Sequence, residues 1–205
     1  MKHLAAYSVL ALIGFLLGPI AGAAEPITIQ SITAAGSACP EGTVSITIAP
    51  DNRSFSVLFD QALVQSSQDN PIENKLCELT IQSRVSAGWK FNLYSNDFRG
   101  FSQVDKSSVT FQRTSYYRLN LKNKWQLLKQ SKKQFTTPFN DNYLINHKLK
   151  LEQPKVVRNE DHVETIKVQL QLVSRSSKQK QTSAQLALDS FDGMVEGSKD
   201  LCSHQ

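Results

Sequence analysis

The feature of this chain that most constrains its fold is a two-residue alternation of apolar and polar side chains. It is clearest over residues 44–48 and 55–59, which flank a polar turn at 50–53. The same period returns in later stretches, at 79–81, 89–93, 109–111, 117–121, 143–151, 166–172 and 184–188. Successive side chains of a β-strand point to opposite faces of the sheet, so the alternation predicts strands with one buried and one exposed face.

The order of these stretches indicates the fold class, because strand follows strand without an intervening helical pattern. About nine strands joined by polar turns predict an all-β protein, an antiparallel β-sandwich that is either immunoglobulin-like or jelly-roll-like. Residues 189–193, Asp-Ser-Phe-Asp-Gly, are typical of a turn and are expected to end the last strand. Long polar loops in solvent are expected at 65–76, 123–133, 153–161 and 174–182.

The first 24 residues have the composition of a secretory signal peptide. Lys2 and His3 form a short basic start, residues 4–17 are predominantly apolar, and small residues occupy 21–24. The apolar run is shorter than the roughly 20 residues that a membrane-spanning helix needs, so cleavage near Ala24 is expected rather than anchoring. We therefore expect one domain over 25–205, secreted or periplasmic, with no transmembrane segment after cleavage.

The charge of the chain is mildly basic and limits the choice of partners. The 23 Lys and Arg residues outnumber the 18 Asp and Glu residues, which gives a formal net charge of +5, and removal of residues 1–24 takes away one lysine. This excess suits weak attraction to an anionic glycan or surface. It is lower than the charge density expected of a dedicated nucleic-acid-binding protein, so nucleic acid is not expected as a partner.

Three cysteines lie beyond the predicted signal peptide: Cys39, Cys77 and Cys202. An exported chain meets an oxidising compartment, where one intramolecular disulfide is expected and one thiol is left over. The strands over 43–48 and 54–59 bring the chain back to the end of the sheet at which the Cys77 strand begins. This path favours a bridge between Cys39 and Cys77 among the possible pairings, with a buried, unpaired Cys77 as the alternative.

Several short motifs appear in a fixed order between the strands. They are Gly-Ser-Ala-Cys-Pro-Glu-Gly at 36–42, Cys-Glu-Leu-Thr-Ile at 77–81, Gly-Trp-Lys-Phe at 88–91, Asp-Phe-Arg-Gly-Phe at 97–101, a Tyr pair at 116–117 and the turn-like segment 189–193. In this order they resemble the motifs of a family of secreted proteins catalogued as domain of unknown function 4360. The resemblance covers nearly all of the chain after residue 24, and it implies a secreted, disulfide-bearing β-domain without implying a reaction.

The chain departs from that family at several positions. Ala38 replaces a glycine before Cys39, and the family's Pro-Cys-Gly before its penultimate strand has no counterpart between Leu151 and His162. This loss explains the odd number of cysteines. The lysine-rich segment 122–133 replaces a stretch that is rich in Ser, Thr and Gly in the family.

The densest polar motif contains Asp97, Arg99 and Asp105. An arginine between two carboxylates can orient a sugar hydroxyl or a carboxylate through its planar set of donors. The alternative is a structural role, in which Arg99 stabilises a tight turn at Gly100 by bidentate pairing with one of the two aspartates. A glycosidase would use two such carboxylates at roughly 5 to 10 Å from each other.

A second candidate site is the cationic segment around Trp125. Lys129, Lys132 and Lys133 follow this tryptophan and are expected at a strand end or hairpin tip, where lysines and an exposed ring can bind anionic glycans or lipid head groups. The alternative is a solvated hairpin whose tryptophan packs against the sandwich.

Motifs for catalysis and for metal or cofactor binding are missing from the sequence. The histidines do not have metal-ligand spacing, and His147 is expected to be a core histidine because it falls on the apolar face of its strand. No nucleophile elbow, phosphate loop or dinucleotide fingerprint is present, so no metal and no cofactor is expected.

The expected function follows from the lack of catalytic, metal-binding and cofactor-binding motifs in the sequence and from the rigid sheet scaffold. We expect non-enzymatic binding to a cell-surface, glycan or protein partner. An extracellular polymer hydrolase that uses carboxylates near Asp97 and Asp105 is the first alternative. A structural envelope or coat component, cross-linked through the third cysteine, is the second.

Overall fold

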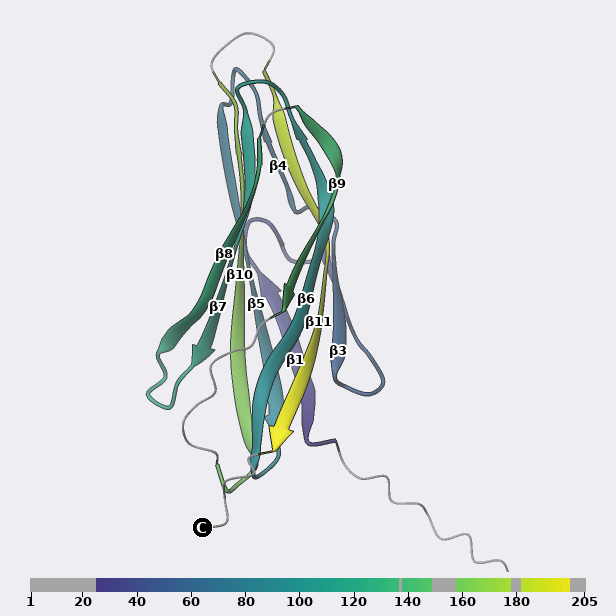
Figure 1. The fold of residues 1–205 in the computed structure, drawn as a ribbon, viewed down its shortest axis with the longest axis vertical. Helices are drawn as coiled ribbons and strands as arrows, with labels where there is room; N and C mark the ends of the chain where they lie inside the picture. The colour runs from purple at the N-terminus through teal and green to yellow at the C-terminus, as the bar shows by residue number, and fades with distance from the viewer. Residues whose placement is uncertain (1–24, 137, 149–157, 178–181, 200–205) are drawn as a thin grey trace, which may run out of the picture.

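Two antiparallel β-sheets pack face to face in the structure, a computed structural model that describes residues 25–136, 138–148, 158–177 and 182–199 (Figure 1). Sheet A has the strand order β1 (Ile27–Ala35), β5 (Ile72–Val85), β10 (His162–Arg175), β7 (Val109–Leu119) and β8 (Trp125–Thr136). Sheet B has the order β2 (Val44–Ile48), β3 (Ser54–Phe59), β11 (Ala184–Lys199), β6 (Trp89–Val104) and β9 (Phe139–Lys148), and the short β4 (Leu63–Ser66) also pairs with β11. The predicted all-β antiparallel sandwich is confirmed.

The described part of the chain has eleven strands, rather than the nine or so that the alternation predicts. The alternation does not predict β1, β4 and β8, and the stretches 109–111 and 117–121, expected as two strands, both belong to β7. The long loops expected at 65–76 and 123–133 are wrong, because β4 and β5 leave only residues 67–71 between them and β8 occupies most of the second stretch. Parts of the other two expected loops, 153–157 and 178–181, lie outside the described residues, as do the predicted signal peptide and Cys202.

The turn expected at residues 189–193 is also wrong, because β11 continues through it to Lys199. A register shift between Leu188 and Ser190 lets the strand pass this point with its pairing to β6 intact. Gly193 lies directly opposite Phe55 of β3, and a Cβ atom on this glycine would overlap the Phe55 ring. The glycine is therefore needed for close packing of a ring against a strand, and not for a turn.

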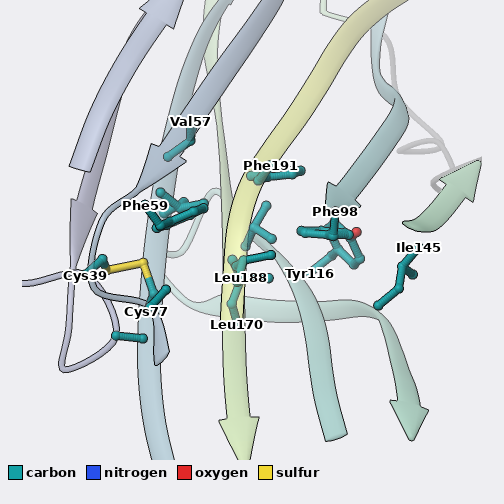
Figure 2. Packing of buried hydrophobic residues seen from close by; sticks show 14 of the residues in the cluster. Cys39, Val57, Phe59, Cys77, Phe98, Tyr116, Ile145, Leu170, Leu188 and Phe191 are labelled. Atoms are coloured by element: carbon teal, nitrogen blue, oxygen red, sulfur yellow. A yellow bond between two sulfur atoms is a disulfide. The ribbon is translucent and has the colours of Figure 1, made fainter. Parts of the chain in front are cut away.

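The core lies between the sheets and is built from the inward half of each alternation (Figure 2). Phe98 of β6 stacks on Phe191 of β11 with ring centroids 4.6 Å apart, and Phe55 meets Phe191 in a T-shaped, edge-to-face arrangement at 5.2 Å. Tyr116 and Leu170 contribute from sheet A. Because these side chains point inward, their neighbours along the strands are directed to the outer faces, where ligands have access.

The disulfide between Cys39 and Cys77 is present, which confirms the predicted pairing (Figure 2). Cys39 lies in the connection by which the chain crosses from β1 in sheet A to β2 in sheet B, and Cys77 is in β5. Both cysteines are buried, and the amide of Ala38 donates a hydrogen bond to the carbonyl of Leu76 at 2.9 Å. The bridge thus fastens the first crossover between the sheets to sheet A.

Candidate functional site

Asp97 and Arg99 lie on the outer face of sheet B, beside an aspartate that the sequence analysis places in a turn and not among the candidate site residues. Arg99 donates a hydrogen bond from Nη1 to Oδ2 of Asp192 in β11 at 2.9 Å, and its Nη2 lies 4.0 Å from Oδ2 of Asp97. Arg99 is therefore placed between two carboxylates. The second carboxylate belongs to Asp192 and not to Asp105.

The register of sheet B places these groups in one row that crosses five strands. Asp192 is directly opposite Ser56 of β3 on one side and Asp97 of β6 on the other, and the row extends to Thr47 of β2 and Asn146 of β9. The apolar neighbours of these residues point into the core, so the row is directed outward. We call these five residues the polar row.

Direct hydrogen bonds hold the polar row in place. Ser56 Oγ donates to Oδ1 of Asp192, and Ser190 Oγ donates to its Oδ2 at 3.3 Å. Asn146 Nδ2 donates to Oδ1 of Asp97 at 2.6 Å. The side chain of Arg99 is nevertheless 57% exposed, whereas those of Asp97 and Asp192 are 28% and 32% exposed. The carboxylates are thus fixed in position, and most of the guanidinium remains available to a ligand.

A groove of about 360 Å³ adjoins the polar row on this face. Its lining combines polar side chains with the apolar surfaces of Phe55 and Met194. The full lining is Thr47, Ala49, Ser54, Phe55, Ser56, Ser95, Asp97, Asp192, Gly193 and Met194. The groove therefore offers carboxylates, hydroxyl groups and an apolar wall to a ligand that lies across β3, β11 and β6.

A second, larger groove of about 580 Å³ lies at the other end of the same face, where β4, β11 and β6 meet. Gln65, Gln185 and Gln103 are paired across these three strands, and their amides are joined in a chain. Gln65 Nε2 donates to Oε1 of Gln185 at 3.2 Å, and Gln185 Nε2 donates to Oε1 of Gln103 at 3.3 Å. We call these three residues the glutamine ladder. Sequence reasoning missed it, although its members occupy outward positions between buried residues.

Asp105 lies apart from the polar row, in the turn that follows β6. Its Oδ2 accepts hydrogen bonds from the backbone amide of Ser183 at 3.1 Å and from the Ser183 hydroxyl at 2.7 Å. Asp105 is eight positions beyond Asp97 along a nearly continuous strand, which corresponds to roughly 26 Å. The structure does not bring Asp105 near Asp97 or Arg99. Asp97 and Asp105 are too far apart to be the two acids of a glycosidase.

The four candidate residues of β8 divide between two sides of this strand. Lys132 lies directly opposite Arg113 on the outer face of sheet A, and Trp125 is on the same face, with the Nζ of Lys167 4.7 Å from its ring centroid. Lys129 is opposite the buried Tyr116, and Lys133 is on the same side of the strand as Lys129. The predicted cationic site is therefore not one cluster.

His147 is half-buried between the sheets, as expected of a core histidine. Its Nδ1 lies 3.2 Å from the hydroxyl of Tyr116, and its Nε2 lies 3.2 Å from the hydroxyl of Ser131. Burial, and next the charge of Lys129, hold the pKa of His147 below its ordinary value. Within the described ranges no three His, Cys, Asp or Glu side chains are grouped to hold a metal ion.

Comparison with known proteins decides the family. The family model described as Domain of unknown function (DUF4360) matches residues 25–201. The chain belongs to this family. A relative from Arthroderma benhamiae, described as an uncharacterized secreted protein, is 34% identical over 95 residues, which are 45% of this chain and 39% of the relative. The match thus spans well under half of that relative's length. The relative is described as secreted, and the secreted location predicted from the sequence is confirmed.

The solved structures that the comparison matches include two sugar complexes. TmCBM61 in complex with beta-1,4-galactotriose aligns with 84% of this chain and 91% of its own, at 9% identity and a TM-score of 0.24. The family 11 carbohydrate-binding module from Clostridium thermocellum, in complex with a mixed-linked tetrasaccharide, aligns with 84% of this chain and 97% of its own, at 9% identity and a TM-score of 0.22. TM-scores this low carry no argument for a shared function. In the part of the chain that the structure covers, no helix is long and apolar enough to cross a membrane.

Proposed function

We propose that this secreted protein binds a neutral, hydroxyl-rich glycan on the outer face of sheet B, without catalysing a reaction. The observation that carries the proposal is the polar row, in which donors and acceptors from five strands lie beside a groove and those of four strands are held by hydrogen bonds. Rigid placement of polar groups lowers the entropy cost of binding, because few side chains remain to be ordered by the ligand.

The chemistry of the row suits sugar hydroxyl groups, which donate and accept hydrogen bonds at once. Asp97 and Asp192 supply acceptors, and the exposed guanidinium of Arg99 supplies donors that its bond to Asp192 does not use. Met194 in the groove and the exposed Leu144, next to Arg99, supply apolar surface for the C–H faces of sugar rings. Two carboxylates against one guanidinium make this face a poor site for an acidic polymer.

The two grooves on this face suggest that the ligand is an extended chain. Gln185 and Asp192 are seven positions apart on β11, which corresponds to roughly 23 Å. The glutamine ladder also offers amide donors and acceptors, which suit the same hydroxyl chemistry. A linear oligosaccharide lying along β11 would contact both the ladder and the polar row.

A hydrolase is the second candidate, because Asp97 and Asp192 are directly opposite each other on neighbouring strands. Side chains in such pairs have Cβ atoms about 5 Å apart, close to the carboxyl spacing of retaining glycosidases. The hydrogen bonds favour the binding role. Both oxygens of Asp192 accept hydrogen bonds, from Ser56, Ser190 and Arg99, so neither is placed to donate a proton to a leaving group.

The experiment is a screen of the purified protein against arrays of neutral and acidic polysaccharides, followed by calorimetry on any oligosaccharide that binds. Arg99→Ala and Asp192→Asn are each expected to weaken binding about tenfold or more, because each removes a charge-assisted hydrogen bond. Asp60→Asn is the matched control, since Asp60 is exposed in the connection between β3 and β4.

Two outcomes contradict the proposal. If no neutral glycan binds, or if Arg99→Ala and Asp192→Asn bind as well as the Asp60→Asn control and the unaltered protein, the polar row is not the site. Turnover of the bound polysaccharide, abolished by Asp192→Asn with the fold intact, would instead support the hydrolase.

A further inference from the structure

Three cations surround one aromatic ring on the outer face of sheet A, the side of the sandwich opposite the polar row. The ring belongs to Phe111 of β7. The Nζ of Lys132 in β8 lies 4.1 Å from its centroid, and the Cζ atoms of Arg113 in β7 and Arg175 in β10 each lie 5.9 Å away. We call Arg113, Lys132 and Arg175 the cation cluster.

The position of Phe111 on the outer face follows from its neighbours. Thr110 and Gln112 point inward, where they bond to Ser102 and Tyr143 of sheet B at 2.8 and 3.1 Å. Phe111 therefore faces outward, yet only 7% of it is exposed. The aliphatic stems of long cationic side chains can cover such a ring while their charged ends stay in water.

The cation cluster has no compensating acid. Among the described residues, none of its three members forms an ion pair or a side-chain hydrogen bond. Arg113 and Lys132 are directly opposite each other on neighbouring strands, an arrangement in which like charges are destabilising. Glu78, an acid on the outward register of β5, is already bonded to Gln169 at 2.7 Å and paired with Lys167 at 3.5 Å.

An uncompensated group of cations is explained by a ligand that brings the negative charge. Apolar side chains would cover Phe111 without repelling one another. The need to shield this ring from water therefore does not explain why three charged side chains surround it. Two guanidinium groups and an ammonium group converge on the ring from three adjacent strands. Planar guanidinium donors match the oxygen spacing of carboxylates and of similar oxyanions such as sulfate.

The same face continues toward a second group of aromatic and cationic side chains. Tyr117 and Trp125 lie farther along β7 and β8, and the Nζ of Lys167 is 5.2 and 4.7 Å from their ring centroids. Phe111 and Tyr117 are six positions apart on β7, which corresponds to roughly 20 Å. A ligand that contacts both groups must be extended and must carry several anionic groups.

We propose that the cation cluster binds carboxylate or sulfate groups of an acidic polysaccharide, which runs along β7 toward Trp125. This site takes a ligand of opposite charge preference to the site proposed on sheet B, and it does not depend on that site. Of the lysines singled out from the sequence, Lys132 belongs to the cluster, whereas Lys129 and Lys133 lie on the other side of β8.

The test compares two double variants that remove the same charge. Arg113→Gln with Lys132→Gln removes two members of the cation cluster, and Lys129→Gln with Lys133→Gln removes two lysines from the other side of β8. Binding to immobilised dextran sulfate, polygalacturonate and uncharged dextran is measured at about 0.15 M salt, where charges farther apart than ~8 Å are largely screened.

The unaltered protein is expected to bind one or both acidic polymers and not uncharged dextran. The cluster variant is expected to bind about tenfold more weakly or worse, because it loses charge-assisted hydrogen bonds. The Lys129 and Lys133 variant is expected to keep its affinity to within about twofold, because its charges point away from the ligand. Arg99→Ala, on the opposite face, is expected to leave this binding unchanged, which separates the two proposed sites.

Several results would overturn the proposal. Equal losses in the two double variants would indicate unspecific charge attraction, and no binding to either acidic polymer would remove the site. Tighter binding to phosphatidylserine vesicles than to both polymers would assign the cluster to a membrane surface. If thermal unfolding shows that the cluster variant does not fold, Arg175→Gln at the exposed end of β10 gives the same test with one charge.

Discussion

His147 is a titratable group that the fold keeps between two sheets. The hydroxyl groups of Tyr116 and Ser131 contact its two ring nitrogens, and the Phe98 ring lies 5.7 Å away, centroid to centroid. Burial is the main reason that its pKa is lowered, and Lys129 adds to the effect. The folded protein therefore favours the neutral ring, so protonation of His147 opposes folding.

This residue makes stability depend on pH in a defined direction. The folded pKa is lowered, so the contribution of His147 is complete above the unfolded value of about 6.5 and is lost as the pH falls through the folded value. We expect the free energy of unfolding, measured with urea from pH 8 to pH 5, to fall by up to about 1.4 kcal/mol per pH unit from this one group. His147→Gln should flatten this part of the curve. Parallel curves for the two proteins would contradict the assignment.

Asp192 shows why one residue of the candidate site could not be found from the sequence. Asp-Gly at 192–193 is a common turn signal, and nothing nearby indicates that the strand continues through it. The strand continues because Gly193 makes room for the Phe55 ring, which comes from β3, far away in sequence. Asp97 and Arg99 were predictable as a polar pair on one face, but their partner depends on which strand lies beside β6.

At the scale of the element, β8 is an edge strand whose lysines have a protective role. Within the described residues it pairs only with β7, so one side of its backbone is open to other strands. Lysines on an edge strand discourage edge-to-edge association, because joining two such edges would bring like charges together.

Removing this protection has a measurable result. Lys129→Val with Lys133→Val is expected to cause concentration-dependent association, detected by light scattering, because it leaves a β-branched, uncharged edge. Lys122→Val with Lys124→Val is the control, since these lysines precede the strand and the net charge changes equally. Equal scattering by both variants would point to net charge as the cause.

Two of the strands that sequence reasoning missed, β8 and β4, lack a clear alternation, each for its own reason. In β8 both sides of the strand are polar over most of its length, and a register shift between Tyr116 and Tyr117 of its partner interrupts the alternation. β4 has only four residues, too few to establish a period. The long alternations of β10 and β9 were predictable because one face of each is apolar, whereas an edge strand is identified by its neighbour.

At the scale of the whole molecule, the disulfide determines how firmly the crossover between β1 and β2 is held. The bridge closes a segment with a sequence separation of 38 residues, and both cysteines are buried in the core. Closing a loop of this size restricts the unfolded chain far more than the folded one.

Replacement of both cysteines tests this role. Cys39→Ala with Cys77→Ala is expected to lower the free energy of unfolding by about 2 to 4 kcal/mol, measured in urea without reductant. The unaltered protein, unfolded with reductant present, should approach the stability of the variant. An unchanged midpoint in the variant would mean that the bridge contributes little to stability.

The strand order within the two sheets determines when each sheet can be completed. The middle strand of sheet A is β10 and the middle strand of sheet B is β11, and these are the last two strands in the described part of the chain. Before β10 is synthesised, β5 and β7 lack the strand that lies between them. In the same way, β3 and β6 lack β11. Contacts between such distant segments form slowly. Pairs such as β2 with β3 and β7 with β8 can form earlier, but neither sheet is complete until the C-terminal strands are present, so we expect the sandwich to close only when nearly all of the chain is available.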